Sequence, residues 1–313
     1  MTEPPLVSVV IPARNAASTI ARAVDSVLAQ DYRPIEVLVI DDASTDATPR
    51  IVAAHPAPEV RLIAADRHRG AGGARNIGIA AARGDIVAFQ DADDEWRPGK
   101  LRRQVALLLS DPTLVFAACG TRFIRADGHD LGPLFNGQHP APGDQTWRGL
   151  LARNTIATPC VVVWRKHLLA ETGFDERLIV AEDQDLWIRL AMRGRLGYIA
   201  EPLVFVHQVL GSVSGVGTGL GYRQQIEITM PMVRRHLASR RGALSARAVR
   251  RILGERWGRI GRSAFTYGHY TDGLRLILRA TLMGFEPLRN VWFLLSAAPF
   301  MRPVKRLLRP NRG

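Results

Sequence analysis

Residues 89–96, FQDADDEW, place four carboxylates directly behind an apolar run: Asp91, Asp93, Asp94 and Glu95. Like charges this close repel one another unless an opposite charge lies among them. One alanine separates the first two aspartates. Hard oxygen donors of this kind suit Mg²⁺ or Mn²⁺, which take one or two protein carboxylates together with waters and phosphate oxygens. The segment therefore predicts a divalent-cation site that acts on a phosphate-bearing ligand; a solvated acidic turn is the alternative.

A glycine-rich segment earlier in the chain suits the anionic partner of such a cation. The stretch HRGAGGARNIGIAAARGD begins with flexible glycines and continues into a helix that carries Arg75. Backbone N–H groups at a helix start attract anions, and a guanidinium matches the oxygens of a diphosphate. The glycine spacing is not G-x-G-x-x-G and does not follow the first strand, which disfavours a nicotinamide dinucleotide. An arginine on a surface helix is the simpler alternative.

The elements that must position these groups alternate along the chain. Continuously apolar strands are expected at 7–12, 36–40, 60–64 and 85–90. Helices are expected after Ser18, between Asp46 and His55, at 72–83 and from Pro98. Strands that alternate with helices in this way, and that are apolar throughout, indicate a parallel sheet covered by helices on both faces.

The polar groups are not scattered over this pattern. Ala13-Arg14-Asn15, Asp41-Asp42 and Asp91 to Asp94 each come directly after a strand. Ligands of open α/β sheets bind at the carboxyl ends of the strands. We therefore expect the three groups to meet at one edge of the sheet.

The rest of the chain is less regular. Strands are expected at 116–123 and 161–164, a helix at 182–193, and two short strands around Pro202 within 196–206. Arg-rich amphipathic helices are expected at 223–238, 246–260 and 272–283. The helix at 182–193 opens with Glu182, Asp183 and Asp185, and acidic residues stabilise helix starts in general.

The charge is unevenly distributed over the 313 residues, whose net charge is +13. Residues 222–313 contain 19 Arg and Lys against 4 Asp and Glu, a net charge of +15, so residues 1–221 hold the remaining 23 against 25. This contrast predicts a near-neutral domain at 1–221 followed by a basic helical region at 222–313. Nucleic acid, anionic lipid and an acidic protein are the partners that such a region attracts.

The compartment is expected to be the cytoplasm. Cys119 and Cys160 lie in apolar surroundings, as expected for buried thiols in a reducing environment. The segment MTEPPLVSVVIPARN has neither the basic start nor the cleavage site of a secretory signal. The apolar stretch 291–301 is shorter than the roughly 20 residues of a membrane-spanning helix.

The order of the motifs carries a resemblance. VSVVIPARN, VLVIDDASTD, GGARNIGIAAARGDIVAFQDADDEW and GFDERLIVAEDQDLWIRL, taken together, resemble the family 2 glycosyltransferases, which are inverting enzymes of the GT-A fold. The similarity covers about residues 6 to 215. It implies a GT-A-like α/β fold: a mostly parallel sheet flanked by helices on both faces, here with a C-terminal helical appendage.

The resemblance also implies roles for individual residues. Those expected to bind the nucleotide sugar are Pro12, Ala13, Asn15, Asp41, Asp42, Arg75 and Asp91. Asp93 would coordinate Mn²⁺ or Mg²⁺, and Asp183 would be the catalytic base. Asp183 lies in the first turn of its helix, where the helix dipole is expected to keep it ionised at pH 7. A cation and Arg75 would stabilise the leaving diphosphate while this carboxylate takes the proton of the acceptor hydroxyl.

Two departures from the family pattern limit the transfer of roles. Many relatives carry a Tyr-Arg pair and then a histidine that sometimes binds metal, whereas this chain has only His207, two positions early, in VHQVLGS. A hydrogen-bonded strand histidine is therefore the favoured interpretation of His207. Processive relatives carry Gln-x-x-Arg-Trp and membrane spans. Here the sequence at 253–257 is LGERW, which lacks the glutamine, so one sugar is expected per encounter.

The predicted function is metal-dependent transfer of one sugar from a nucleoside-diphosphate sugar, UDP-linked by preference, to a saccharide or lipid-linked acceptor in cell-surface polysaccharide or glycolipid synthesis. A catalytically inactive sugar-nucleotide-binding relative and a nucleic-acid-binding protein are the alternatives, and the second leaves the acidic cluster unexplained. For the basic region 222–313, helices that simply pack on the catalytic domain and leave their arginines in water are the simpler alternative. The functional hypothesis is contact with the inner face of an anionic membrane, which is favoured over nucleic acid by aromatic and basic residues near the C-terminus: Trp292, Phe293, Phe300, Arg302, Lys305, Arg306 and Arg309.

Overall fold

The computed structural model describes residues 3–141, 146–208, 221–240 and 242–297. It divides the chain into two compact units, Met1–Ser212 and Val213–Gly313. The sequence-based boundary between residues 221 and 222 falls a few positions later, just after a segment outside the described residues. The two units are considered separately below.

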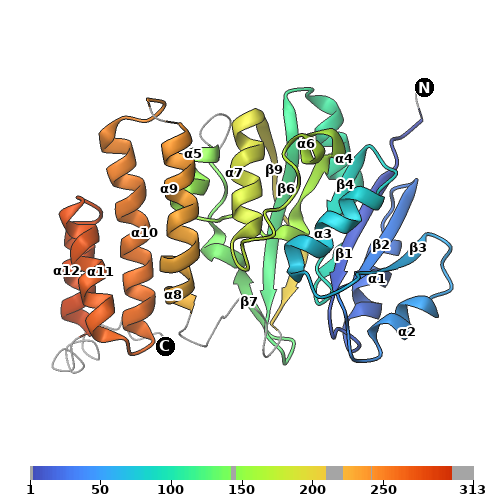
Figure 1. The fold of residues 1–313 in the computed structure, drawn as a ribbon, viewed down its shortest axis with the longest axis horizontal. Helices are drawn as coiled ribbons and strands as arrows, with labels where there is room; N and C mark the ends of the chain where they lie inside the picture. The colour runs from blue at the N-terminus through green and yellow to red at the C-terminus, as the bar shows by residue number, and fades with distance from the viewer. Residues whose placement is uncertain (1–2, 142–145, 209–220, 241, 298–313) are drawn as a thin grey trace, which may run out of the picture. The chain divides into compact units, whose positions relative to one another are not determined.

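The first unit is built on a sheet of nine strands in its described part (Figure 1). Eight of them lie in the order β3-β2-β1-β4-β8-β6-β9-β5, and β7 pairs with β6. The strands are β1 (Val7–Ala13), β2 (Ile35–Asp41), β3 (Val60–Ala64), β4 (Ile86–Phe89), β5 (Glu95–Trp96), β6 (Leu114–Ile124), β7 (Asp130–Pro133), β8 (Val162–Trp164) and β9 (Arg195–His207). β1, β2, β3, β4, β6 and β9 run in one direction, and β5, β7 and β8 run against them. The predicted, mostly parallel sheet is confirmed.

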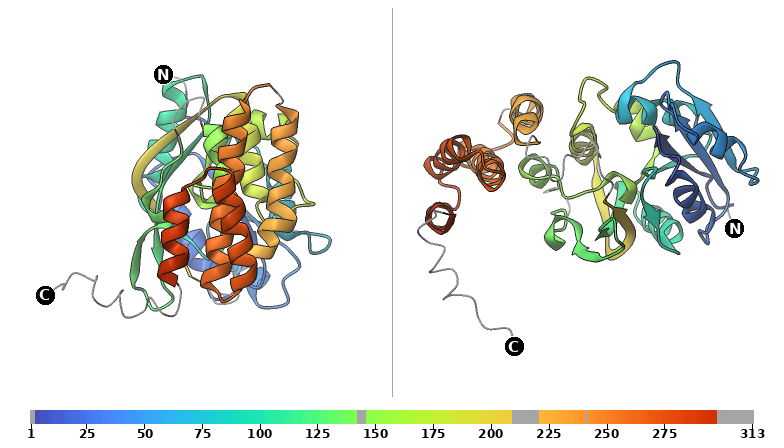
Figure 2. Two further views of the ribbon diagram at one scale, coloured as in Figure 1. Left: turned by 90° about the vertical axis from the view of Figure 1, so that its left-hand side faces the viewer. Right: turned by 90° about the horizontal axis from the view of Figure 1, so that it is seen from below.

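Helices cover both faces of this sheet (Figures 1 and 2). They are α1 (Ile20–Leu28), α2 (Thr48–Ala53), α3 (Gly70–Ala81), α4 (Lys100–Ser110), α5 (Thr146–Ala152), α6 (Arg165–Ala170) and α7 (Glu182–Arg193). The central strands β1 and β4 are almost entirely buried because alternate side chains serve opposite layers. Val9 of β1 belongs to the core that includes Val24 of α1. The next residue, Val10, meets α3 so closely that a Cβ at Gly78 would lie 2.3 Å from its Cγ1.

The prediction of two short strands around Pro202 is wrong, because β9 runs unbroken from Arg195 to His207. The pairing absorbs the proline through a bulge: Cys119 of β6 pairs with Ile199, and the next residue, Gly120, pairs with Pro202. A Cβ at Gly120 would lie 2.6 Å from the carbonyl oxygen of Ala200. The backbone of the bulge therefore approaches Gly120 so closely that only glycine fits there. The two-residue strand β5, which was not predicted, pairs with the far end of β9.

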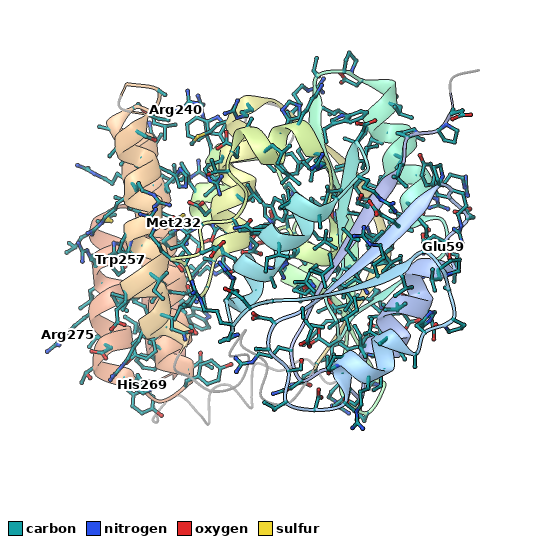
Figure 3. All side chains as sticks on the ribbon, turned by 45° about the vertical axis from the view of Figure 1, so that its right-hand side comes forward. Glu59, Met232, Arg240, Trp257, His269 and Arg275 are labelled. Atoms are coloured by element: carbon teal, nitrogen blue, oxygen red, sulfur yellow. The ribbon has the colours of Figure 1, made fainter. Side chains whose placement is uncertain are left out.

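The second unit is helical in its described part, as predicted. It contains α8 (Gly221–Gln224), a π-helical turn (Gln225–Thr229), α9 (Met230–Ser239), α10 (Ala246–Thr266), α11 (Tyr270–Leu282) and α12 (Pro287–Ala297). Its core includes Trp257, which is labelled in Figure 3. Ile260, Ala264 and Ala280 belong to the same cluster. α10 and α11 pack closely at Gly261, which has no side chain. A Cβ there would lie 2.8 Å from the backbone nitrogen of Ile277. No helix among the described residues has the length and apolarity that a membrane span requires.

Candidate active site

The three predicted polar groups do lie at one edge of the sheet. Because β1, β2 and β4 are parallel neighbours, their carboxyl ends fall side by side. The last residue of β1, Ala13, is in register with Asp41, the last residue of β2, and the N–H of Asp42 donates to the carbonyl of Ala13 at 2.8 Å. The acidic segment follows β4, whose Phe89 pairs with Val10.

Asp41 and Asp42 differ in what they leave free for a ligand. The Asp42 carboxylate accepts hydrogen bonds from the backbone N–H groups of Arg69 and Gly70 at 2.6 and 2.9 Å, and from Nδ1 of His68 at 2.7 Å. It is therefore occupied in holding the start of α3. Asp41 accepts one backbone bond through Oδ2, from Ser44 at 3.3 Å, whereas its buried Oδ1 has no partner. A buried carboxylate oxygen without a donor is suited to receive an N–H or O–H group from a ligand.

The residues around Asn15 shape the same end of the sheet. Asn15 adopts a left-handed backbone conformation (φ 50°), its N–H donates to Oγ of Ser44 at 3.0 Å, and its Oδ1 accepts the N–H of Thr45 at 2.8 Å. Pro12 and Ala13, the last two residues of β1, precede this turn. These contacts fix the loop after β2 against the loop after β1, as a preformed nucleotide pocket requires.

Arg14, which lies between Ala13 and Asn15, adds a further contact at this end of the sheet. Its Nη1 donates to Nε2 of His68 at 2.6 Å. Since an arginine can only donate, Nε2 accepts, and the imidazole proton lies on Nδ1, which faces Asp42. The hydrogen bonds from Arg14 to His68 and from His68 to Asp42 thereby join the ends of β1 and β2 to the segment before α3.

Arg75 connects the acidic segment with the start of α7. It is 4% exposed, and its two Nη atoms donate to Oδ1 of Asp91 at 2.7 Å and to Oε1 of Glu182 at 3.0 Å. Burial opposes its charge, but the carboxylates of Asp91 and Glu182 outweigh that cost and raise the pKa of Arg75. Its buried Nε has no hydrogen-bond partner. Arg75 therefore positions two acidic segments and keeps one donor unused.

The acidic segment has the charge imbalance that a cation would relieve. Burial and the neighbouring Asp91 raise the pKa of Asp93 to about 6. Burial, together with Asp91 and Asp93, raises the pKa of Asp94 well above its usual range. Among the described residues no group of three or more acidic, histidine or cysteine side chains is arranged to hold a metal by itself. The donor set therefore fits Mg²⁺ or Mn²⁺ held by one or two carboxylates together with diphosphate oxygens, rather than an all-protein cage.

His207 contributes to the structure of the acidic segment rather than to cation binding. Its backbone N–H donates to Oδ1 of Asp94 at 3.0 Å. Its Nε2 lies 3.5 Å from Oε2 of Glu95, too far for a strong hydrogen bond. Burial and the charge of Arg22 lower the pKa of His207, so the ring is neutral at pH 7. A strand histidine that anchors the acidic turn is the role that these contacts support.

Asp183 is half-buried in the first turn of α7, next to the Arg75 network. Its Oδ1 accepts the N–H of Gln184 at 2.6 Å, and its Oδ2 accepts Nδ2 of Asn154 at 3.0 Å. Burial and the adjacent charge of Glu182 raise the pKa of Asp183 to about 7. The expectation that the helix dipole keeps this carboxylate fully ionised at pH 7 is therefore wrong. A carboxylate that titrates near neutral pH is a stronger base than an ordinary aspartate.

Three contributors to the site were not predicted. Glu182 was regarded only as an acidic helix start, and Asn154 had no local signal, because its partner is 29 residues away. Arg22 of α1 donates to the backbone carbonyl of Asp93 at 2.6 Å and so orients the turn that carries the acidic cluster.

Comparison with known proteins shows which sequences and folds this chain resembles. The profile of "Glycosyl transferase family 2" matches residues 8–171. The succinoglycan biosynthesis protein ExoO of Rhizobium meliloti (strain 1021) is 57% identical over 101 residues, 32% of this chain but only 29% of its own length. The amylovoran biosynthesis glycosyltransferase AmsB of Erwinia amylovora is 33% identical over 64% of this chain and 69% of its own length. The Escherichia coli UDP-Glc:α-D-GlcNAc-diphosphoundecaprenol β-1,3-glucosyltransferase WfaP is 30% identical over 60% of this chain and 71% of its own length.

The fold has relatives among solved structures. The mannosyltransferase PcManGT from Pyrobaculum calidifontis, solved in complex with GDP-Man and Mn²⁺, superposes with a TM-score of 0.62 at 21% identity and covers 97% of this chain and 84% of its own. At that identity the likeness concerns the fold, which is GT-A-like. The family profile covers more than half of the sequence, and the matched region holds the edge at which the ends of β1, β2 and β4 meet. The chain belongs to glycosyl transferase family 2.

Proposed function

We propose that this protein is a metal-dependent, inverting glycosyltransferase that moves one sugar from a nucleoside-diphosphate sugar to an acceptor hydroxyl. One observation carries the proposal: Arg75 binds Asp91 of the acidic segment and Glu182 beside Asp183. The residues suited to a cation and a diphosphate are thereby held next to a carboxylate that titrates near pH 7. Displacement at an anomeric carbon needs both, on opposite sides of the reacting sugar.

The proposed roles of the residues are based on the polar atoms that their present hydrogen bonds leave available to a ligand. Asp41 Oδ1 is available for the nucleoside, within the wall formed by Pro12, Ala13 and Asn15. Asp93, with Asp91, would hold Mg²⁺ or Mn²⁺, which when bound neutralises charge on the leaving diphosphate. Arg75 orients Asp91 and offers its unused Nε. Asp183 takes the proton of the acceptor hydroxyl, and Asn154 fixes the orientation of its carboxylate.

UDP-sugars are the proposed donors, and a role in cell-surface polysaccharide or glycolipid synthesis is the proposed context. ExoO and AmsB are named for succinoglycan and amylovoran biosynthesis, and WfaP for a UDP-Glc donor and a diphosphoundecaprenol-linked acceptor. PcManGT was solved with GDP-Man, so guanosine donors belong in any screen.

The purified protein should release nucleoside diphosphate from at least one UDP-, GDP- or dTDP-hexose when Mn²⁺ or Mg²⁺ is present, and EDTA should stop the release. A coupled assay for nucleoside diphosphate measures this with water or an added saccharide as acceptor. Metal-dependent binding without turnover of any donor would instead identify a sugar-nucleotide-binding relative that lacks activity. Absence of both binding and turnover would contradict the proposal as a whole.

We further propose that the second unit contacts an anionic membrane through one face of α11 and α12. Apolar side chains that are 41–87% exposed recur there at helical spacing: Leu274, Leu278, Leu282, Leu288, Val291 and Trp292. Arg275 and Arg289 are exposed on the same two helices (Figure 3 shows Arg275). Apolar side chains flanked by arginines are typical of helices that lie in the headgroup region. A second copy of the chain is disfavoured as the occupant, because residues 222–313 carry a net charge of +15 and two such units repel each other.

The residues proposed for this contact differ from those expected from the sequence. Phe293 was expected at the membrane, but its ring packs edge-on against Phe265 at 5.7 Å and is part of the fold. Trp292 remains part of the proposed contact, because 55% of its surface is exposed. Phe300, Arg302, Lys305, Arg306 and Arg309 lie outside the described residues.

The double variant Leu278→Glu/Leu282→Glu should weaken co-sedimentation with vesicles containing phosphatidylglycerol by about tenfold or more, since each change removes roughly 1 kcal/mol of apolar insertion and adds a repelled charge. Leu169→Glu, which changes a leucine of the first unit that is about as exposed as Leu278, should have no effect. Equal binding by both variants would contradict the assignment of this face. Salt-sensitive binding to duplex DNA without vesicle binding would favour nucleic acid as the partner.

A further inference from the structure

A cavity of about 150 Å³ in the first unit has no role in the chemistry described so far. It lies where β6 and β9 face the segment 133–139 that follows β7. Its wall also includes Thr155 and Ala157, from the segment that follows α5. The cavity is smaller than the roughly 300–1,000 Å³ of sites for drug-sized ligands, so its size suits a single ring.

The bulge of β9 forms one side of the cavity. Gly120, Ala200 and Pro202, which make the irregular pairing between β6 and β9, all line it. Two further lining residues, Phe135 and Gly137, have left-handed backbone conformations, with φ of 56° and 69°. A left-handed conformation is unfavourable for phenylalanine and persists where the surrounding structure requires it. The cavity is therefore a consequence of two unusual backbone segments rather than a gap between regular elements.

The lining combines aromatic and hydroxyl groups. Tyr198 and His139 lie with ring centroids 5.1 Å apart, and the Tyr198 hydroxyl is 2.9 Å from Nδ1 of His139. Burial raises the pKa of Tyr198, so its hydroxyl stays protonated and can donate or accept. Thr155 and Gln138 add further neutral hydrogen-bonding groups, and Leu134 adds apolar surface. Ring faces with neutral donors and acceptors beside them suit a ligand that is apolar on one side and hydroxylated at its edge.

The charge of the lining disfavours an anionic ligand. Among the described residues that line the cavity, the basic side chain of Arg122 is already paired with Asp130 at 2.6 Å. A phosphate or carboxylate would compete with Asp130 for that guanidinium. An uncharged sugar ring would not.

The cavity is also close in the chain to the proposed base. Asn154, which donates to Asp183 at 3.0 Å, directly precedes Thr155, which lines the cavity. A ring bound beside Thr155 is thus placed near the carboxylate that would take its proton. We propose that this cavity binds the acceptor sugar ring, with Tyr198 and His139 as the residues that select it. The inference rests on the proposed function, and it adds that the acceptor ends in an uncharged monosaccharide unit.

Blocking the cavity should stop sugar transfer to an acceptor but leave metal-dependent hydrolysis of the donor intact. Ala200 is an exposed lining residue outside the catalytic groups, so Ala200→Cys supplies a site for a bulky methanethiosulfonate reagent. The labelled variant should lose at least about tenfold in binding of methyl hexosides, tested as a panel by saturation-transfer NMR, and the same factor in transfer. Metal-dependent hydrolysis of the donor should persist. Leu131→Cys, labelled in the same way at an exposed position outside the lining, is the matched control, and treated wild type controls for Cys119 in the cavity wall.

A second variant tests selection without a bulky adduct. Tyr198→Phe removes the hydroxyl and keeps the ring, so the KM for the acceptor should rise about five- to tenfold with little change in kcat, as expected for the loss of one hydrogen bond to bound sugar. If no methyl hexoside in the panel binds wild type, or if binding and transfer are unchanged in the labelled Ala200→Cys protein, the cavity is not the acceptor site. Donor turnover that persists in those cases would leave the proposed function standing. Its absence in wild type would remove both.

Discussion

Replacing Asp183 with asparagine is expected to lower kcat for sugar transfer by about 10²–10⁴-fold, the usual contribution of a positioned general base. The asparagine keeps the size of the side chain, and its amide oxygen can still accept the Gln184 N–H. Its NH2 group cannot accept from Nδ2 of Asn154, so that bond is lost together with the capacity to take a proton. Binding of nucleoside diphosphate and Mn²⁺ should be unchanged within a few-fold. Kinetics and thermal-shift titration with UDP and Mn²⁺ measure the two effects separately.

The pH profile gives the same prediction a second readout. Burial and the charge of Glu182 raise the pKa of Asp183 to about 7, and the base acts only when deprotonated. In wild type, kcat should therefore rise about tenfold per pH unit below pH 7 and level off above it. That limb should be absent from the residual activity of Asp183→Asn. A profile that is flat between pH 5 and 8 in wild type would assign the base to another group.

The stability of the variant distinguishes lost chemistry from lost folding. Since the folded-state pKa of Asp183 lies above its unfolded value, the native state holds this proton more tightly, and the carboxylate costs stability as pH rises from about 4 through 7. Relief of that cost should offset the lost bond from Asn154, so Asp183→Asn should stay within about 1 kcal/mol of the wild-type stability at pH 8. Asp31→Asn, which removes an exposed carboxylate paired with Arg102, is the control that should leave both activity and pH profile unchanged.

The parts of the site that could be predicted are those fixed by local pattern and strand direction. Continuously apolar strands indicated a parallel sheet, and parallel strands bring their carboxyl ends to one edge. The groups after β1, β2 and β4 therefore had to meet. The helix from Glu182 to Arg193 was placed correctly because its apolar periodicity and acidic start agree.

The parts that could not be predicted depend on contacts between distant segments. Arg75 reaches Glu182 over 107 residues, and no local pattern encodes that pair. Asp41 and Asp42 are equivalent in sequence, and only the turn at Arg69 and Gly70 decides that Asp42 is occupied while Asp41 Oδ1 is free. The pKa of Asp183 was misjudged for the same reason, because the helix dipole is visible in the sequence whereas burial is not.

The second large effect is expected at Asp93. Asp93→Asn should abolish the metal-dependent part of nucleotide binding, since a neutral amide is a much weaker ligand for a hard divalent ion than a carboxylate. In wild type, the complex of UDP with Mn²⁺, added at about 100 times its dissociation constant, should stabilise the fold by about 2.7 kcal/mol, or roughly 5–10 °C in Tm. In the variant, UDP should give the same small shift with and without Mn²⁺, and donor turnover should fall by at least about 100-fold.

The charge balance of the acidic segment explains why this loss is not a folding defect. Without a cation, the Asp93 carboxylate lies near Asp91 and Asp94, and the raised pKa values of Asp93 and Asp94 reflect that repulsion and their burial. Removing one charge relieves repulsion, so Asp93→Asn should be no less stable than wild type in EDTA. Its ligand response should be lost while its own Tm is kept. A variant that still responds to Mn²⁺ and UDP as wild type does would show that the ion binds elsewhere, and the roles proposed for Asp91 and Arg75 would then need a different ligand.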